Sequence, residues 1–168
     1  FFDWPLEKAR EYPDCFRIVK ERVKPERESK SADVASAAWW QHWRIREELY
    51  RAIAPLERVM VIATQATKYT SLVFTSSNLI FSNAVAVVSN ERFYLWSLLN
   101  NSLHDQWAWK NCSSLDARLR YAPTDGFETF PFPPGVSLDK RKDDVLNPFE
   151  EALERIGEEY HVFRSSLM

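Results

Sequence analysis

The sequence predicts an α+β fold in which a small antiparallel sheet of three to five strands is flanked by helices. Three observations support this. Three apolar stretches have the length and the Val, Ile, Phe and Thr content of strands, apolar residues recur at helical spacing on both sides of them, and 45% of the 168 residues are hydrophobic. The 14% aromatic content also argues against a disordered chain. We therefore expect a folded domain with appended helices.

The N-terminal segment, residues 1–30, is expected to be helical. A proline opens each of two helices, which we predict over residues 5–12 and 13–25. Three apolar residues of the second helix recur at helical spacing: Phe16, Val19 and Val23. Residues 26–36 are charged and rich in serine, which indicates a linker or a loop that a partner orders.

A second domain, residues 37–134, is expected to hold the sheet. It contains a helix over residues 47–54 and then three strands that pair as an antiparallel meander: residues 58–66, 69–75 and 79–88. The first strand is apolar on both faces, so both faces of the sheet should be covered. One helix over residues 93–110 should lie on the sheet. Two short extended pieces close the domain: residues 119–122 and 127–132.

The C-terminal segment, residues 135–168, is predicted to be a charged linker followed by one helix. Asn147 and Pro148 are typical of an N-cap and a first helical turn. Six apolar residues then alternate steps of four and three, and we call them the heptad seam: Phe149, Leu153, Ile156, Tyr160, Phe163 and Leu167. We expect the seam to pack the C-terminal helix on the N-terminal helix. A free arm for a partner is the alternative.

Several classes of site lack their residues. The three glycines do not share a loop, which excludes the P-loop and the dinucleotide-binding turn. Two cysteines and three histidines are scattered, so we expect neither a disulfide framework nor a metal site. The longest apolar-rich run, residues 59–66, is too short for a membrane helix. His104 and Asp105 point about 100° apart on a helix, which does not make a catalytic dyad. We expect no catalytic residue and no cofactor in this chain.

The end of the second domain is the most specific segment. Residues 119–124 (Leu-Arg-Tyr-Ala-Pro-Thr) and 127–133 (Phe-Glu-Thr-Phe-Pro-Phe-Pro) resemble the end of the target recognition domain of type IIG restriction-modification enzymes. They also resemble the corresponding domain of related large adenine-specific DNA methyltransferases, including those of BREX phage-defence systems. Further segments follow in family order: Val23–Arg27, Trp39-Trp40 with Arg44-x-Arg46, Lys68, Ser82-Asn83, Leu99–Asn101, His104 and Trp107. Where the family often has an arginine, three residues before the lysine, this chain has Gln65.

The resemblance implies a module that recognises a sequence in double-stranded DNA. It also implies a SAM-dependent adenine methyltransferase domain in the same protein, often with an N-terminal nuclease, and a bacterial or archaeal cytoplasm. Neither catalytic domain lies in this chain, so SAM is expected to bind elsewhere in the parent protein. We expect double-stranded DNA and the methyltransferase domain as partners, and no membrane.

Residues near position 119 carry the chemistry that reads base edges. Arg118 and Arg120 flank Leu119, so in a strand both project from one face together with Asp116. Arginine pairs with guanine and a carboxylate accepts from cytosine in the major groove. Without the resemblance, a solvated edge strand is the simpler interpretation; with it, we expect base reading. Four residues in neighbouring turns are expected to join them: Lys68, Tyr69, Asn111 and Ser113.

Other basic and aromatic residues complete the hypothesis. Three are expected to contact phosphate, which positions a protein on DNA without specifying sequence: Arg44, Arg46 and Lys110. Trp39, Trp40 and Trp43 are expected to seal a core rather than stack on an extruded base. The sequence therefore predicts a DNA-recognition module. The alternative is a non-catalytic interaction module that docks a partner through the heptad seam.

Overall fold

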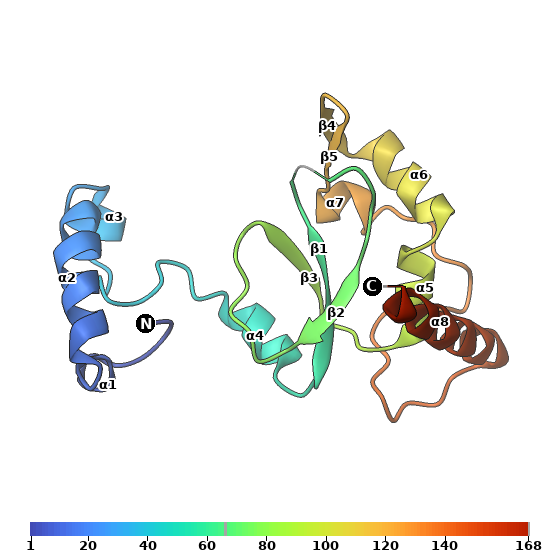
Figure 1. Ribbon diagram of the computed structural model, residues 1–168, viewed down its shortest axis with the longest axis horizontal. Coiled ribbons are helices and arrows are strands. Elements are labelled where there is room, and N and C mark those ends of the chain that lie inside the picture. Colours follow the sequence, from blue (N-terminus) through green and yellow to red (C-terminus); the bar gives the residue numbers. More distant parts are fainter. Residues whose placement is uncertain (66, 168) are drawn as a thin grey trace. The chain divides into compact units, whose positions relative to one another are not determined.

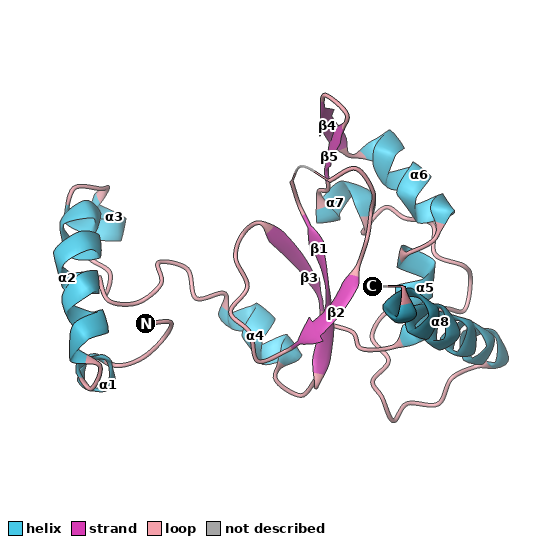
Figure 2. Cartoon of the chain, viewed as in Figure 1, coloured by secondary structure: helices cyan, strands magenta, loops and turns pink. Residues whose placement is uncertain are grey.

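The computed structural model describes residues 1–65 and 67–167, shown in Figures 1 and 2. The chain divides into two compact units, Phe1–Glu48 and Leu49–Met168. The described residues form eight helices and five short strands, and all of the strands lie in the second unit. The predicted α+β class is therefore confirmed, whereas the predicted limits at residues 30, 37 and 134 stay a prediction.

The first unit consists of three helices: α1 (Leu6–Arg10), α2 (Pro13–Glu28) and α3 (Ala32–Ala35). Prolines open the first two helices as predicted, but α2 continues past Pro25, so the predicted end of the helix is wrong. The helix continues because its last turn bonds to a segment 11 to 14 residues further along the chain. Arg27 lies two residues further along α2 than Pro25 and donates hydrogen bonds to the carbonyls of Ala38 and Gln41, which holds the last turn in place.

An aromatic cluster forms the interior of the first unit. The ring of Phe16 lies 5.3 Å from that of Trp39, and the indole Nε1 of Trp40 donates to the carbonyl of Trp4 at 3.0 Å. Trp39 and Trp40 thus pack within the unit as predicted, whereas Trp43 is exposed. Phe16 is covered by aromatic rings of its own unit, so it does not depend on the C-terminal helix for cover.

The second unit is built on a three-stranded antiparallel sheet with the order β2-β1-β3. Helix α4 (Glu47–Ile53) precedes β1 (Arg58–Ala63), which pairs with both β2 (Val73–Ser76) and β3 (Val85–Val88). The predicted meander is therefore wrong, because β3 pairs with β1 rather than with β2. The composition of β1 explains this order: its residues are apolar on both faces, and a strand of this kind is best covered at the centre of a sheet.

Two helices replace the single helix predicted over residues 93–110: α5 (Phe93–Leu99) and α6 (Ser102–Asn111). The break lies at two asparagines whose side chains compete for backbone groups. The Asn100 amide donates to the carbonyl of Trp96 and its oxygen accepts from the N–H of Leu72, while Asn101 caps α6 at the N–H of His104. These bonds change the direction of the chain between the two helices.

A β-hairpin and a short helix follow α6. The hairpin consists of β4 (Ser113–Leu115) and β5 (Arg118–Arg120), and α7 (Pro123–Gly126) comes after it. The predicted strand over residues 119–122 is thus partly present as β5. The piece predicted to be extended over residues 127–132 forms a turn instead, in which three phenylalanine rings contact one another: Phe127, Phe130 and Phe132.

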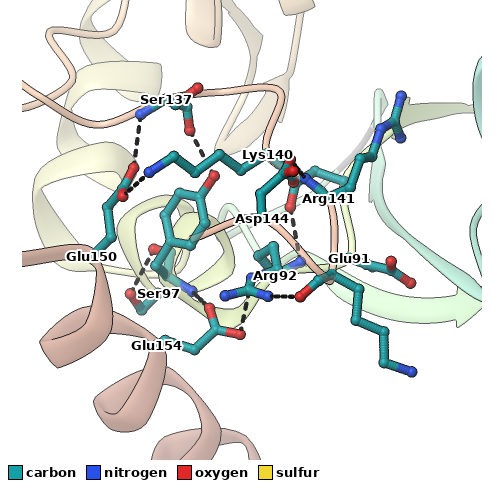
Figure 3. Close-up of polar contacts among 12 residues, drawn as sticks. Glu91, Arg92, Ser97, Ser137, Lys140, Arg141, Asp144, Glu150 and Glu154 are labelled. Atoms are coloured by element: carbon teal, nitrogen blue, oxygen red, sulfur yellow. Dashed lines mark hydrogen bonds and ion pairs between the residues drawn. The ribbon is translucent and has the colours of Figure 1, made fainter. Parts of the chain in front are cut away.

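The C-terminal helix α8 (Pro148–Ser166) begins as predicted, with Asn147 as N-cap and Pro148 in the first turn. Glu150 completes a capping box and is fully buried, and its carboxylate accepts from the N–H of Asn147. The same carboxylate accepts from the N–H of Ser137 and pairs with Lys140, as Figure 3 shows. Burial alone raises the pKa of Glu150, but the bonds from Lys140 and the two N–H groups outweigh burial and lower it. The charged linker is therefore fixed to the helix.

Helix α8 packs within the chain as predicted, and its partner is α5 (Figure 2) rather than the segment around Phe16, Val19 and Val23. The Glu154 carboxylate accepts from the N–H of Tyr94 in the first turn of α5 at 2.7 Å and lies 3.3 Å from the Arg92 guanidinium. The His161 ring packs against Phe74, Phe93 and Trp96. The partner of α8 thus comes from its own unit.

The heptad seam is largely exposed, which corrects the prediction that it is the packing face. Leu153 is half-buried, and the other five seam residues are exposed: Phe149, Ile156, Tyr160, Phe163 and Leu167. The face turned to α5 includes Glu150, Gly157 and His161 instead. Polar contacts of the glutamates with α5 and the linker, together with a close approach at Gly157, orient the helix in this way.

Replacing Gly157 by alanine should destabilise the second unit. A Cβ at this position would lie 2.4 Å from the carbonyl oxygen of Phe93, so α8 and α5 would have to separate, at a cost of about 1 to 3 kcal/mol. Helix propensity alone predicts the opposite sign, a gain of about 1 kcal/mol. Thermal unfolding of Gly157→Ala measures the sign, and the exposed Ala152→Gly is the control for propensity. A raised melting temperature in Gly157→Ala would contradict the close packing.

Candidate nucleic-acid interface

The β4–β5 hairpin is anchored through its second strand. On one side β5 pairs with β4, and on the other Leu119 exchanges both backbone hydrogen bonds with Thr67, with N···O distances of 2.7 and 3.3 Å. The Leu119 side chain is completely buried in the core of the second unit. In Figure 1 the hairpin projects beyond the three-stranded sheet, next to α6 and α7. The tip is thus presented to solvent from a fixed base.

The buried Leu119 sends its neighbours to the opposite face, because side chains alternate along a strand. Arg118 and Arg120 are both exposed, and the structure places them on one face as the sequence predicts. Residues paired across strands share a face, so Ser113, opposite Arg120, and Leu115, opposite Arg118, belong to the same surface. We call the surface formed by these four residues the hairpin face.

Asp116 is not part of the strand, which corrects the prediction that it projects from the same extended segment as the two arginines. It lies in the two-residue turn between β4 and β5 with a φ of 55°, in the left-handed region. Aspartate tolerates this conformation better than most residues, and primed hairpin turns require it. The exposed Asp116 carboxylate is therefore at the tip of the hairpin, next to the hairpin face.

A shallow hollow of about 220 Å³ lies on the hairpin face. Its lining residues are Gln65, from the β1–β2 connection, and Leu115, Arg118 and Arg120 of the hairpin. The hollow thus presents two guanidinium groups, one amide and one apolar side chain. Sequence reasoning did not include Gln65 or Leu115 among the site residues. The position of Gln65 three residues before Lys68, where the family often has arginine, was the signal for Gln65.

The connection between β1 and β2 is bonded to other elements at three points. Thr67 pairs with Leu119; the N–H and hydroxyl of Thr70 donate to the Asp105 carboxylate at 2.8 and 2.9 Å; and the N–H of Leu72 donates to Asn100. Lys68 and Tyr69, both exposed, lie between the first two points. The Lys68 ammonium is 5.2 Å from the Tyr69 ring centre. These two predicted residues are therefore held beside the hairpin.

A buried histidine supports the hairpin from behind. His104 is fully buried; its Nδ1 donates to the carbonyl of Leu99 at 2.8 Å, and its Nε2 accepts from the hydroxyl of Tyr121 at 3.2 Å. Phe130 packs edge-on against the same imidazole, at 4.9 Å between ring centres. An added Cβ at Gly126 would meet the Tyr121 ring at 2.7 Å, so a side chain there would displace it. Residues 121–132, which we call the aromatic segment, thus fix the hairpin to α6.

The other predicted residues fall into two groups. Lys110 and Asn111, both exposed, lie in the last turn of α6, directly before the hairpin; the Asn111 amide donates to the carbonyl of Trp107 at 2.8 Å. Arg44 and Arg46 are exposed in the first unit, in the segment that leads to α4, and Arg46 has a φ of 58°. The hairpin, the β1–β2 connection and the end of α6 therefore form one candidate interface within the second unit.

Residues 1–65 and 67–167 hold neither a metal-binding cluster nor a membrane-spanning helix. No group of three or more His, Cys, Asp or Glu side chains there is arranged to hold a metal ion. In the same residues, no helix has the length and apolar content that crossing a membrane requires. The adjacent His104 and Asp105 have separate structural contacts, with Leu99 and Tyr121 on one side and Thr70 on the other.

Comparison with known protein families identifies the chain. The family model described as the MmeI target recognition domain matches residues 3–134, which include the hairpin, the β1–β2 connection and the aromatic segment. The chain belongs to the MmeI target recognition domain family. The resemblance to target recognition domains of restriction-modification enzymes, inferred from the motif around residues 119–133, is thereby confirmed.

A solved structure shows the same fold as this MmeI-family domain. It is the structure of the type IIL restriction-modification enzyme MmeI in complex with DNA, with a TM-score of 0.67 and 20% sequence identity. The match covers 88% of this chain and 18% of the MmeI chain. The domain thus spans less than a fifth of the length of that enzyme. No curated protein matches the chain.

The stability of this MmeI-family domain should fall as the pH drops below about 6.5. Burial lowers the pKa of His104 below its ordinary value of 6.5, although its hydrogen bonds oppose the shift. The stability that the neutral imidazole contributes is present above pH 6.5 and is lost as the pH falls toward the lower pKa of the folded state. Melting temperatures at about pH 7.5 and about pH 5.5 measure the loss.

The variant His104→Asn distinguishes this cause from general acid denaturation. The pKa of His161 is lowered in the same direction, first by burial, so some pH dependence should remain in the variant. The difference between the two melting temperatures should nevertheless shrink when His104 is removed. An unchanged difference would show that the buried imidazole does not titrate as its environment requires.

Proposed function

We propose that this chain recognises a specific sequence in double-stranded DNA by inserting the β4–β5 hairpin into the major groove. The single observation that carries the proposal is the fixed pair of exposed arginines on the hairpin face, which Leu119 and Thr67 hold in register. A two-stranded β-ribbon fits the major groove, and arginine is the commonest reader of guanine there. The relative MmeI, with which the chain shares its fold, was solved in complex with DNA.

The residues have two roles in this proposal. Seven residues are assigned to base edges: Asp116, Arg118, Arg120, Lys68, Tyr69, Asn111 and Ser113. To these we add Gln65, because its amide lines the same hollow and an amide of this type pairs with adenine. Three basic residues are assigned to phosphates: Arg44, Arg46 and Lys110.

The parent protein is proposed to be a SAM-dependent adenine methyltransferase of a restriction-modification or phage-defence system, with or without an endonuclease, in a bacterial or archaeal cytoplasm. Membership of the MmeI family and the type IIG resemblance support this. The methyltransferase domain of the same protein would bind SAM and carry out the chemistry. The present chain would recognise the DNA sequence and would bind no cofactor of its own.

Replacing Arg118 or Arg120 by alanine in the full-length protein should change the recognised sequence. Loss of a bidentate contact to guanine costs about 1 to 3 kcal/mol for the cognate site and relaxes the preference at one base pair. Sequencing of methylated sites reads the preference directly. An unchanged motif with unchanged occupancy in both variants would contradict the proposal. The hairpin would then be only a solvated edge strand without a role in base reading.

The matched comparison is Lys110→Ala and Arg44→Ala. If these residues contact phosphate, their loss should weaken binding to all sequences to a similar degree and flatten the dependence of affinity on salt. The methylated motif should stay the same while fewer copies of it are modified. This pattern is qualitatively different from that of the hairpin variants.

A second candidate function is a non-catalytic interaction module that docks a partner through α8. One observation favours it: five of the six residues of the heptad seam are exposed along one side of the helix. Exposed apolar rows of this kind are uncommon on domains that act alone. The two functions are compatible, because α8 and the hairpin belong to different parts of the second unit.

The pair Ile156→Glu and Phe163→Glu tests the docking role. Both side chains are exposed, so in the isolated chain each variant should change the free energy of unfolding by no more than about 0.5 kcal/mol. If the seam docks on the rest of the parent protein, the same changes should lower the stability or solubility of the full-length protein. Equal behaviour of variant and parent proteins at full length would remove the support for this second function.

A further inference from the structure

Leu115 is an apolar side chain in a place where the rest of the surface is polar. It is 67% exposed at the end of β4, and all of the remaining residues from Ser113 to Arg118 are exposed as well. Its neighbours in the turn and across the hairpin are Asp116 and Arg118, so it does not belong to an apolar patch that another protein could cover. The isolated side chain therefore offers an apolar contact of the size of one small group.

The pairing of the hairpin determines the direction of this side chain. Leu115 lies opposite Arg118 and so shares its face, while the alternate residue Leu119 points into the core. Leu115 also lines the hollow that Gln65, Arg118 and Arg120 form. The hollow therefore surrounds one apolar group with three hydrogen-bonding side chains, all held by the same anchored strand and its neighbours.

We propose that Leu115 contacts the 5-methyl group of a thymine next to the base that Arg118 reads. The proposal rests on the proposed DNA recognition and assigns one further specificity residue to it. Among the groups that bases present in the major groove, the thymine methyl is the apolar one, and apolar side chains are its usual partners. Arg118 and Leu115 are paired across the hairpin, so the base pairs that they meet should be adjacent.

The test uses the full-length protein and its own recognition sequence. Each thymine of the site is replaced in turn by uracil, which removes only the methyl group, and the affinity for each duplex is measured. One replacement should weaken binding by the parent protein about fourfold, the factor expected from withdrawing one methyl-sized group from an apolar contact. Leu115→Ala should bind the unmodified site about fourfold more weakly and should lose its response to that one uracil.

The control is Leu103→Ala. Leu103 is exposed to a similar degree, 70%, but lies in the first turn of α6 and not in the hollow. This variant should respond to uracil as the parent protein does. An equal response of the parent protein and Leu115→Ala to every uracil would overturn the proposal, and so would a recognition sequence without a thymine beside the base pair that Arg118 reads.

Failure of this inference can be told apart from failure of the proposed function. If Arg118→Ala changes the methylated motif and no uracil weakens binding, the hairpin reads DNA but Leu115 does not contact a methyl group. If Arg118→Ala and Arg120→Ala both leave the motif and its occupancy unchanged, the assignment of the hairpin itself is wrong, and the assignment of Leu115 is overturned with it.

Discussion

The pairing of Leu119 with Thr67 is the constraint on which the candidate interface depends. Two backbone hydrogen bonds and a fully buried side chain fix one residue of β5, and the alternation of the strand then determines where both neighbouring arginines point. A slip of one residue would bury the charged side chains and expose the leucine, so the register is strongly specified. The exposed tip of the hairpin therefore has a defined orientation although few of its atoms are buried.

Most residues of the motif that indicated the family contribute to this support rather than to the surface. Tyr121 bonds to the buried His104, Gly126 allows the Tyr121 ring to approach, and Phe130 packs on the imidazole. The hairpin residues that we propose to read bases precede Tyr121 and are exposed. Buried residues that fix the hairpin thus alternate with exposed residues along a short stretch of chain. An exposed side chain can be exchanged there without disturbing the buried neighbours that position it.

The sequence predicted the elements better than their pairing. The existence of three strands, the N-cap at Asn147 and the shared face of Arg118 and Arg120 depend on local periodicity and capping, which can be read from residue types. The strand order β2-β1-β3 and the pairing of Leu119 with Thr67 depend on contacts between distant segments, for which one sequence holds no direct signal.

The errors have the same physical origin. The heptad seam has a regular apolar period, yet α8 turns a different face to α5, because buried and half-buried glutamates bond to backbone N–H groups and Gly157 permits close approach. Likewise, Asn100 and Asn101 divide an apparently continuous helix through side-chain bonds to the backbone. In both cases specific polar contacts, and not the spacing of the apolar residues, determined the structure. Gln65 joined the site for a related reason, since only the folded β1–β2 connection brings it to the arginines.

Charge is distributed unevenly within the second unit, although the net charge of the chain is only −2. Helix α8 carries five glutamates and two arginines and is acidic. The hairpin face carries Arg118 and Arg120, with Asp116 at its tip and Lys68 and Lys110 exposed beside it. In the proposed role, the acidic α8 would repel a phosphate backbone and the basic residues beside the hairpin would attract it. The net charge would then limit the overall affinity, while the separation of the two signs would select the hairpin as the surface that meets DNA.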